Sequence, residues 1–196
     1  MKRAFDIIFS LLAICLLLPV FIIISVLVLF SGEGGIFFIQ KRVGKNNKDF
    51  SLIKFRTMRP GSDKKGLLTV GAKDNRVTKT GYFLRKFKLD ELPQLFNVLI
   101  GDMSIVGPRP EVRKYVDLYN EEQKKVLSVK PGITDYASIK YVNENEILGK
   151  SENPEETYIK EIMPAKLKIN LEYINNKSFW KDFKIIFKTI AAIISH

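Results

Sequence analysis

Two adjacent carboxylates, Asp90 and Glu91, are the residues whose types and spacing best suit catalysis in this sequence. A basic run precedes them and Pro93 follows. Adjacent side chains on a regular helix point about 100° apart, so both can reach one site only at a helix edge or a kink. Pro93 favours such a distortion. Most adjacent acid pairs are solvated surface charges. Taken alone, the pair is therefore compatible with either a surface or a catalytic role.

Several basic residues are candidates for binding phosphate. Arg109 lies in the loop Gly107-Pro108-Arg109-Pro110, whose rigidity suits bidentate contact with a phosphate. Lys54 and Arg56 alternate with Phe55 on a predicted strand, so they share a face and could join the same cationic site. Arg109 could equally be an exposed arginine in a structural turn. Lys54 and Arg56 could equally lie on the solvated face of a half-buried strand.

The composition narrows the chemistry that these residues could perform. The only histidine is His196, the last residue, so neither a Ser-His-Asp triad nor a His-rich zinc site is available. The single cysteine, Cys15, lies in an apolar run, which excludes an internal disulfide and predicts a buried structural thiol. A catalyst here therefore depends on carboxylates, lysine, arginine and hydroxyls, with or without a hard metal ion.

The chain is strongly basic, with a formal net charge of +11 and a sequence pI near 9.6. Such an excess favours polyanionic partners: nucleic acid, anionic lipid headgroups or phosphorylated substrates. Neither paired Cys/His ligands nor a basic region running into heptads occurs, so we expect no nucleic-acid partner.

An uncharged stretch, residues 7–30, precedes all of these candidates. As a helix it would be roughly 36 Å long, enough to span a bilayer core. Basic residues flank both of its ends, and positive flanks tend to stay cytoplasmic. Pro19 near its middle would kink the helix. A re-entrant helix that returns to the side it entered satisfies both observations, while a plain spanning anchor remains the alternative.

The remaining sequence predicts a charge-rich domain of helices and short strands. Two strands at residues 36–42 and 49–58 are joined by a turn, and residues 60–80 form a loop. Apolar residues at three- and four-residue spacing predict a helix over residues 81–99, broken at Pro93. Further expected elements are a helix at residues 111–126, a strand at 133–142 and a helix at 153–174.

The C-terminal stretch, residues 179–194, carries aromatic and aliphatic residues on one helical stripe and three lysines away from it. This composition is typical of a helix that lies in the membrane interface. A helix packed on the domain core fits the same pattern. In either case we expect the domain to sit against the bilayer surface.

Four long motifs occur in order along the chain. They are Lys54-Phe-Arg-Thr-Met58, Leu89-Asp-Glu-Leu-Pro-Gln-Leu-Phe-Asn-Val98, Gly101-Asp-Met-Ser-Ile-Val-Gly-Pro-Arg-Pro110 and Lys130-Pro-Gly-Ile-Thr134. Together they closely resemble the bacterial sugar transferase family, the small monotopic phosphoglycosyl transferases that start glycan assembly on a polyprenyl carrier. The resemblance covers nearly the whole chain.

The resemblance implies a role for each candidate residue. Asp90 matches the family's nucleophile, which forms a covalent phosphosugar intermediate and releases a nucleoside monophosphate. Glu91 matches its partner, which prepares the lipid phosphate acceptor. Family members require Mg²⁺, with the aspartate as a ligand. Lys54, Arg85 and Arg109 fall where the family places cationic phosphate contacts.

The resemblance also implies the architecture and its surroundings. We expect an α+β fold: a re-entrant membrane helix at residues 1–31, broken at Pro19, then a small, mainly helical domain at residues 32–196. That domain would carry a short β-hairpin and interfacial amphipathic helices, and would lie on the cytoplasmic face of the bacterial inner membrane. The expected partners are a UDP-sugar, polyprenyl phosphate and the lipid bilayer. A homodimer is left open.

The chain departs from the family pattern at two places. Leu18 precedes the proline where the family often has Ser, which puts the details of the helix break in doubt. Asp135-Tyr136 stands where many members have Gly-Trp, in a region that could set sugar or nucleotide preference, so the sugar is not assigned. The chain length leans toward the small acetamido-sugar type over a hexose type. A non-catalytic membrane-surface scaffold that binds phospholipid or nucleotide-sugar is the alternative function.

Overall fold

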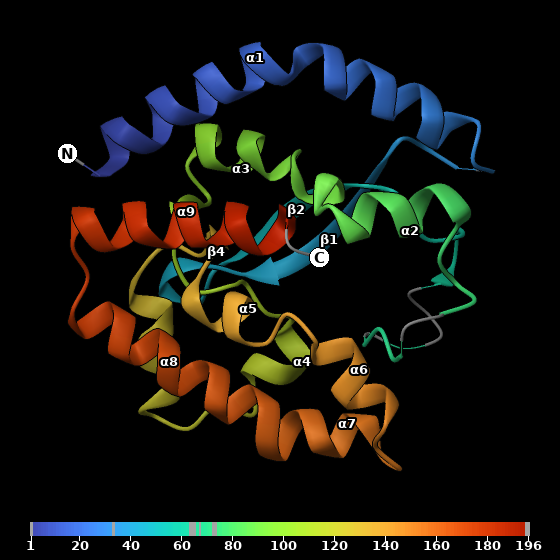
Figure 1. The fold of residues 1–196 in the computed structure, drawn as a ribbon. Coiled ribbons are helices and arrows are strands. Elements are labelled where there is room, and N and C mark those ends of the chain that lie inside the picture. Colours follow the sequence, from blue (N-terminus) through green and yellow to red (C-terminus); the bar gives the residue numbers. More distant parts are fainter. Residues whose placement is uncertain (1, 33, 63–65, 67, 72–73, 195–196) are drawn as a thin grey trace.

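In the computed structural model, which describes residues 2–32, 34–62, 66, 68–71 and 74–194, the apolar run forms one long helix, α1 (Lys2–Leu29). Only 17% of its most apolar 18-residue window is buried, so by length and composition α1 could cross a membrane. It passes through Pro19 as one continuous helix, so the expected break at this proline is wrong, and it curves over one side of the molecule (Figure 1). Cys15 is exposed, so its predicted burial is wrong: this face of α1 has no protein covering it.

Polar contacts fix both ends of α1 to the same domain. Near its start, Asp6 Oδ1 accepts hydrogen bonds from Ser104 Oγ and from the Ile105 N–H, both at 3.1 Å. At its end, the buried Arg56 guanidinium donates to the carbonyl oxygen of Val28 at 2.9 Å. The last carbonyls of a helix lack partners within the helix, so Arg56 caps α1.

The two predicted strands form an antiparallel hairpin of β1 (Phe37–Val43) and β2 (Asp49–Phe55), with the first residue of β1 opposite the last of β2. Asn46 and Asn47 in the connection have φ angles of 56° and 59°. Asn tolerates this left-handed conformation better than most residues, which lets the chain reverse here.

The segment around the carboxylate pair consists of α2 (Lys79–Lys86), a 3₁₀ turn (Leu89–Glu91) and α3 (Gln94–Ile100). The predicted break at Pro93 is therefore misplaced. The helical run ends at Lys88, whose φ of 55° is left-handed and cannot continue a right-handed helix. Pro93 precedes α3, where its missing N–H leaves no hydrogen bond unmade.

A second, parallel pair joins β3 (Ser104–Val106) to β4 (Gly132–Thr134). The strand predicted at residues 133–142 is wrong beyond Thr134. Asp135 Oδ1 accepts a hydrogen bond of 2.6 Å from the Ser138 N–H and so caps a helix, α5 (Tyr136–Lys140).

The helix predicted at residues 111–126 is also largely wrong. Only α4 (Arg113–Val116) is α-helical, and turns and a 3₁₀ segment (Gln123–Ser128) follow it. Asn120 and Gln123 exchange side-chain-to-backbone hydrogen bonds of 3.0 and 2.9 Å. These bonds satisfy the backbone locally and replace the helical ladder.

The C-terminal part is helical, as predicted. Its elements are α6 (Glu144–Gly149), α7 (Pro154–Thr157), a π-helical turn (Tyr158–Ile162), α8 (Met163–Asn175) and α9 (Phe179–Ile194). Figure 1 shows α1 and α8 on opposite sides of the molecule, with the hairpin, α3 and α9 between them. His196 and residues 63–65, 67 and 72–73 of the predicted loop lie outside the described residues.

Three apolar clusters hold these layers together. One lies between the end of β1, α4 and α8, a second between β2, α3, β3 and α9, and a third between α1, β2 and α2. The carboxylate pair follows α2 and precedes α3, both of which contact α1. The site is therefore built where the membrane-competent helix meets the domain.

Candidate active site

Asp90 and Glu91 are both buried, with 6% and 7% of their surfaces exposed. The 3₁₀ turn that carries them follows the left-handed Lys88, and a left-handed non-glycine residue costs free energy that the surrounding structure must supply. The turn removes both carboxylates from a regular helix surface. The surface-charge interpretation of the pair is therefore wrong.

Glu91 is engaged by two of the predicted cations. Lys54 Nζ donates to Glu91 Oε1 at 2.8 Å, and Arg109 donates to both carboxylate oxygens, with Nη1 3.1 Å from Oε2. Burial alone would raise the pKa of Glu91, but the charges of Arg109 and Lys54 outweigh burial and hold this pKa well below its usual range. Glu91 is therefore a stable carboxylate that orders two cations.

Asp90 differs from its neighbour. In the described part of the chain its buried Oδ1 has no hydrogen-bond partner. Burial raises the pKa of Asp90, while the positive charges of Lys54 and Arg85 oppose that rise. An unpaired carboxylate oxygen among cations is suited to attack an electrophile or to bind a hard metal ion.

Arg85 extends from α2 toward Asp90 and is held by hydroxyl groups. Its Nε donates to Thr57 Oγ1 at 2.9 Å and its Nη1 to Thr69 Oγ1 at 3.2 Å. Burial lowers the pKa of Arg85, and the charge of Asp90 is the largest influence that opposes it. Because neutral oxygens hold the guanidinium, its charge remains available to a phosphate.

The structure brings Asp90, Glu91, Lys54, Arg85 and Arg109 into one site, but it does not bring in Arg56. β2 ends at Phe55, so the alternation that would place Lys54 and Arg56 on one face stops there. The Arg56 side chain turns to the end of α1, where it donates to Val28 and also to the Gly35 carbonyl at 2.6 Å.

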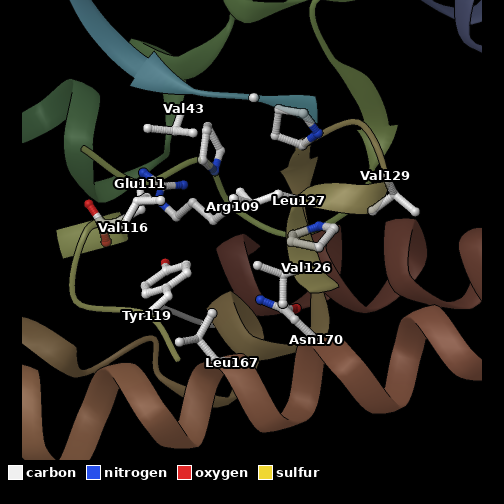
Figure 2. Close-up of a pocket in the computed structure, with 14 residues that line it drawn as sticks. Val43, Arg109, Glu111, Val116, Tyr119, Val126, Leu127, Val129, Leu167 and Asn170 are labelled. Atoms are coloured by element: carbon white, nitrogen blue, oxygen red, sulfur yellow. The ribbon is translucent and has the colours of Figure 1, made fainter. Parts of the chain in front are cut away.

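A close crossing of two backbones positions the loop that carries Arg109. A Cβ atom at Gly132 would lie only 2.1 Å from the Gly107 nitrogen. Non-bonded atoms cannot approach so closely, so only glycine fits at this position. Figure 2 shows Arg109 beside a cavity of about 30 Å³, between Val43 on one side and Tyr119 and Leu167 on the other. The loop therefore rests on the first apolar cluster.

Two further residues hold the site, and neither is among the candidate site residues predicted from the sequence. Asp135 Oδ2 accepts a hydrogen bond of 3.0 Å from the backbone N–H of Arg109, which ties the arginine loop to α5. The fully buried Asn97 donates to the Ser51 carbonyl at 2.7 Å and accepts from the Ile53 N–H at 3.0 Å. Asn97 thus fastens α3 to the strand that carries Lys54.

Both Asn97 and Asp135 can be picked out in the sequence. Asn97 is a polar residue in the otherwise apolar Leu95–Val98 stretch, which indicates a buried amide with defined partners. Asp135 stands out in the sequence as a departure from the family pattern, in a region that could set sugar or nucleotide preference.

The donors available for a metal ion are few. The described residues contain no group of three or more His, Cys, Asp or Glu side chains placed to hold one. Mg²⁺ is commonly bound by one or two carboxylates together with substrate phosphates and water, so it needs no such group. The unpaired Oδ1 of Asp90 fits this kind of site.

Comparison with known proteins adds independent information. The chain matches the family described as bacterial sugar transferase over residues 1–196. It is 39% identical over 197 residues to the UDP-N-acetylgalactosamine-undecaprenyl-phosphate N-acetylgalactosaminephosphotransferase of Aeromonas hydrophila, covering 99% of this chain and 44% of that protein. It is 38% identical over 197 residues to the UDP-glucose:undecaprenyl-phosphate glucose-1-phosphate transferase of Escherichia coli K12, covering 97% of this chain and 39% of that protein.

A third relative is similar in length. The uncharacterized sugar transferase EpsL of Bacillus subtilis is 37% identical over 194 residues, covering 99% of this chain and 87% of that protein. The chain thus spans less than half of the first two relatives and most of the third. The four motifs, the assembled site and these matches agree, and the chain belongs to the bacterial sugar transferase family.

Proposed function

We propose that this protein transfers a sugar 1-phosphate from a UDP-sugar to polyprenyl phosphate, giving polyprenyl-diphosphate-sugar and UMP. The observation that carries this proposal is the buried Asp90 carboxylate, whose unpaired Oδ1 lies among basic residues that suit phosphates. The names of the two longer relatives, each a UDP-sugar:undecaprenyl-phosphate transferase, support the same reaction class. Those names contain different sugars at nearly equal identity, so the sugar is left unassigned.

Asp90 is the proposed nucleophile of a two-step reaction. In the first step a carboxylate oxygen attacks the phosphorus that carries the sugar, the bond from that phosphorus to the bridging oxygen breaks, and UMP leaves with the electron pair. The product is an acyl phosphate that joins Asp90 to the sugar phosphate. In the second step an oxygen of polyprenyl phosphate attacks the same phosphorus, and the Asp90 carboxylate is the leaving group.

The cations make this attack feasible. A carboxylate is repelled by an anionic diphosphate, so charge neutralisation must supply much of the barrier reduction. Arg85, which is held by hydroxyls, is available to the incoming phosphates, and Lys54 and Arg109 are held in place by Glu91. We assign Glu91 to positioning these two cations, because its low pKa makes it a weak base. Its implied role in preparing the lipid phosphate would need a rearrangement of these ion pairs.

Asp90 also suits Mg²⁺ through its unpaired oxygen. When bound, the ion would neutralise phosphate charge and favour departure of UMP. Asp90 is the only carboxylate of the pair with a free oxygen, because both oxygens of Glu91 accept hydrogen bonds from cations.

We further propose that α1 is re-entrant and that the domain lies on the cytoplasmic face of the inner membrane. The contacts of Asp6 near the start of α1 and of Arg56 at its end tie both ends to one domain. A straight span would separate its ends by the bilayer core of about 30 Å, which leaves one end in the opposite compartment. Exposed apolar residues on α9, such as Trp180 and Phe187, extend the surface that a bilayer would cover.

Release of UMP from a UDP-sugar in the presence of undecaprenyl phosphate and Mg²⁺ tests the activity. Asp90→Asn removes the nucleophile and is expected to abolish release, whereas Asp117→Asn, at a surface acid whose side chain is 62% exposed, should leave it unchanged. Full activity of Asp90→Asn would contradict the assignment. The alternative, a non-catalytic scaffold, predicts binding of UDP-sugar without UMP release from any variant.

A further inference from the structure

A cavity of about 460 Å³ lies between α5, α8 and α9, and it shares no lining residue with the carboxylate site. We call it the α9 pocket. Its lining includes three lysines, Lys140, Lys181 and Lys188, and one carboxylate, Glu172. The pocket is therefore an electropositive hollow, separate from the place where the phosphosugar chemistry is proposed.

The lysines of the α9 pocket are free to bind an anion. Within the described part of the chain, none of the three forms a salt bridge, in contrast to Lys54, which is paired with Glu91. Lys188 Nζ lies 5.6 Å from the centre of the Tyr136 ring, a cation–π contact that orients its ammonium group without neutralising it. Tyr136 also lines the pocket.

The side chains of α9 divide into three sectors. Asp182 and Ile185 are buried against the domain. Phe179, Trp180 and Phe187 are exposed apolar residues, with 51%, 80% and 66% of their surfaces accessible. Between these sectors lie the exposed lysines, and two of them, Lys181 and Lys188, line the pocket.

The arrangement of these three sectors around α9 places the pocket at the level of the lipid headgroups. A helix with one exposed apolar sector lies in the membrane interface with that sector toward the acyl chains. Lysines beside such a sector extend toward the phosphate layer of the membrane, with their aliphatic stems along the apolar surface. The cavity beneath them is then open to a headgroup, and only an anionic one complements three lysines against one glutamate.

We propose that the α9 pocket binds the headgroup of an anionic phospholipid such as phosphatidylglycerol, and so fixes the depth and orientation of α9 on the membrane. This inference rests on the proposed placement of α9 at the bilayer, but not on the proposed chemistry at Asp90. The bound lipid would be a structural ligand, not a substrate.

Trp180 provides the measurement, because it is the only tryptophan of the chain and precedes Lys181. The full chain is placed in phosphatidylcholine vesicles that contain a minor fraction of brominated phosphatidylglycerol, or the same fraction of brominated phosphatidylcholine. Bromine quenches nearby tryptophan, so stronger quenching by the brominated phosphatidylglycerol reports its enrichment around α9. We expect this enrichment to fall by more than about fivefold for each pocket lysine that is changed to glutamine, because about fivefold is the ratio typical of one lysine near an anionic surface without a specific site.

Lys184 is the matched control, because it is an exposed lysine of the same helix that does not line the pocket. Lys181→Gln and Lys188→Gln should lose enrichment, Lys188→Arg should retain it, and Lys184→Gln should lose clearly less than either, by no more than the roughly fivefold expected for general surface attraction alone. Equal losses at Lys184 and Lys188 would overturn the pocket as a site and leave only diffuse attraction.

Two further outcomes would also overturn the proposal. If UMP or inorganic phosphate abolished the enrichment at constant ionic strength, the pocket would belong to a soluble anion. If neither brominated lipid quenched Trp180, α9 would not lie at the bilayer. Release of UMP from the UDP-sugar is assayed separately in each variant, so failure of this proposal is distinguishable from failure of the proposed reaction.

Discussion

Asp90 and Glu91 are neighbours in the sequence but have opposite electrostatic environments. Glu91 is neutralised by Lys54 and Arg109, whereas Asp90 keeps an unpaired buried oxygen. Two carboxylates whose surroundings move their pKa values in opposite directions have different roles in a site. The difference supports a division of labour in which Asp90 reacts and Glu91 positions cations.

Glu91→Gln tests that division at the level of one residue. The amide preserves shape but can no longer neutralise two cations, so Lys54 and Arg109 should lose their fixed positions. We expect the rate of UMP release to fall by about a hundredfold or more, comparable to the loss of one electrostatic group at an active site. Glu121→Gln, at an acid whose side chain is 91% exposed, is the control. An unchanged rate would contradict the positioning role.

The pH dependence of the first step tests the environment of Asp90. Only the ionised carboxylate attacks, and burial raises its pKa, so the rate should rise with pH through a value above the usual range for aspartate. The charge of Lys88 lowers this pKa, so Lys88→Gln should move the rise to higher pH. Lys86→Gln is the comparison, because Lys86 lies in α2 and contacts Phe87 instead. The initial burst of UMP, followed as a function of pH, gives both curves.

The sequence located the residues that the structure brings together in the candidate site, but not their conformations. The motifs contain Asp90, Glu91, Lys54 and Arg109, and Arg85 lies in the basic run just before the second motif. The left-handed Lys88 and the capping role of Arg56 were not predictable, because both depend on contacts with distant segments.

At the scale of elements, the site depends on how short segments cross one another. Two glycines, one in the Arg109 loop and one in β4, allow the loop and the strand to approach more closely than side chains permit. Asn97 and Asp135 then fix α3 to β2 and the arginine loop to α5. Through these contacts, the packing of the apolar clusters fixes the positions of the groups proposed to bind phosphate.

Gly132→Ala tests the crossing. The added methyl group would overlap the backbone at Gly107, so the arginine loop must move. We expect a loss of about 1–3 kcal/mol in the free energy of unfolding, the usual cost of overpacking, together with weaker binding of the UDP-sugar. Gly35→Ala is the control, because a Cβ there meets only Phe37 O, at 3.9 Å. Denaturant unfolding and nucleotide-sugar titration measure the two effects. Equal free energies of unfolding and equal affinities for the UDP-sugar in the two variants would refute the role of the crossing.

Elements with strong periodicity or turn chemistry were predictable, and those set by local capping were not. The hairpin, the helix at residues 153–174 and the bounds of α9 agree with the sequence pattern. The prediction for residues 111–126 was wrong because Asn120 and Gln123 satisfy the backbone by side-chain hydrogen bonds. The strand at 133–142 was wrong because Asp135 caps α5. In both places a polar side chain outweighed an apolar pattern.

At the scale of the whole molecule, α1 and the domain form one unit. α1 contacts α3, β2, β3 and α2, and its two ends make polar contacts with the domain. Hydropathy predicted a membrane helix but not these contacts, because they join residues 98 and 28 positions apart in the sequence.

Cysteine labelling tests the proposed re-entrant path. Cys15 is the only cysteine, so Cys15→Ser gives a background for Ala4→Cys, before the apolar run, and Lys41→Cys, after it. A re-entrant α1 predicts that a membrane-impermeant maleimide labels both sites in inverted inner-membrane vesicles and neither in intact spheroplasts. Labelling of Ala4→Cys alone in spheroplasts would show that α1 spans the membrane.

In the proposed reaction, Asp90 carries the phosphosugar between the two substrates. The most direct measurement mixes the full chain with UDP-sugar and Mg²⁺ in the absence of polyprenyl phosphate, quenches with acid, and locates any adduct by peptide mass spectrometry. The proposed reaction predicts one UMP released for each protein molecule and a sugar phosphate attached to Asp90. UMP release that occurs only when polyprenyl phosphate is present, with no adduct, or an adduct on another residue, would contradict it.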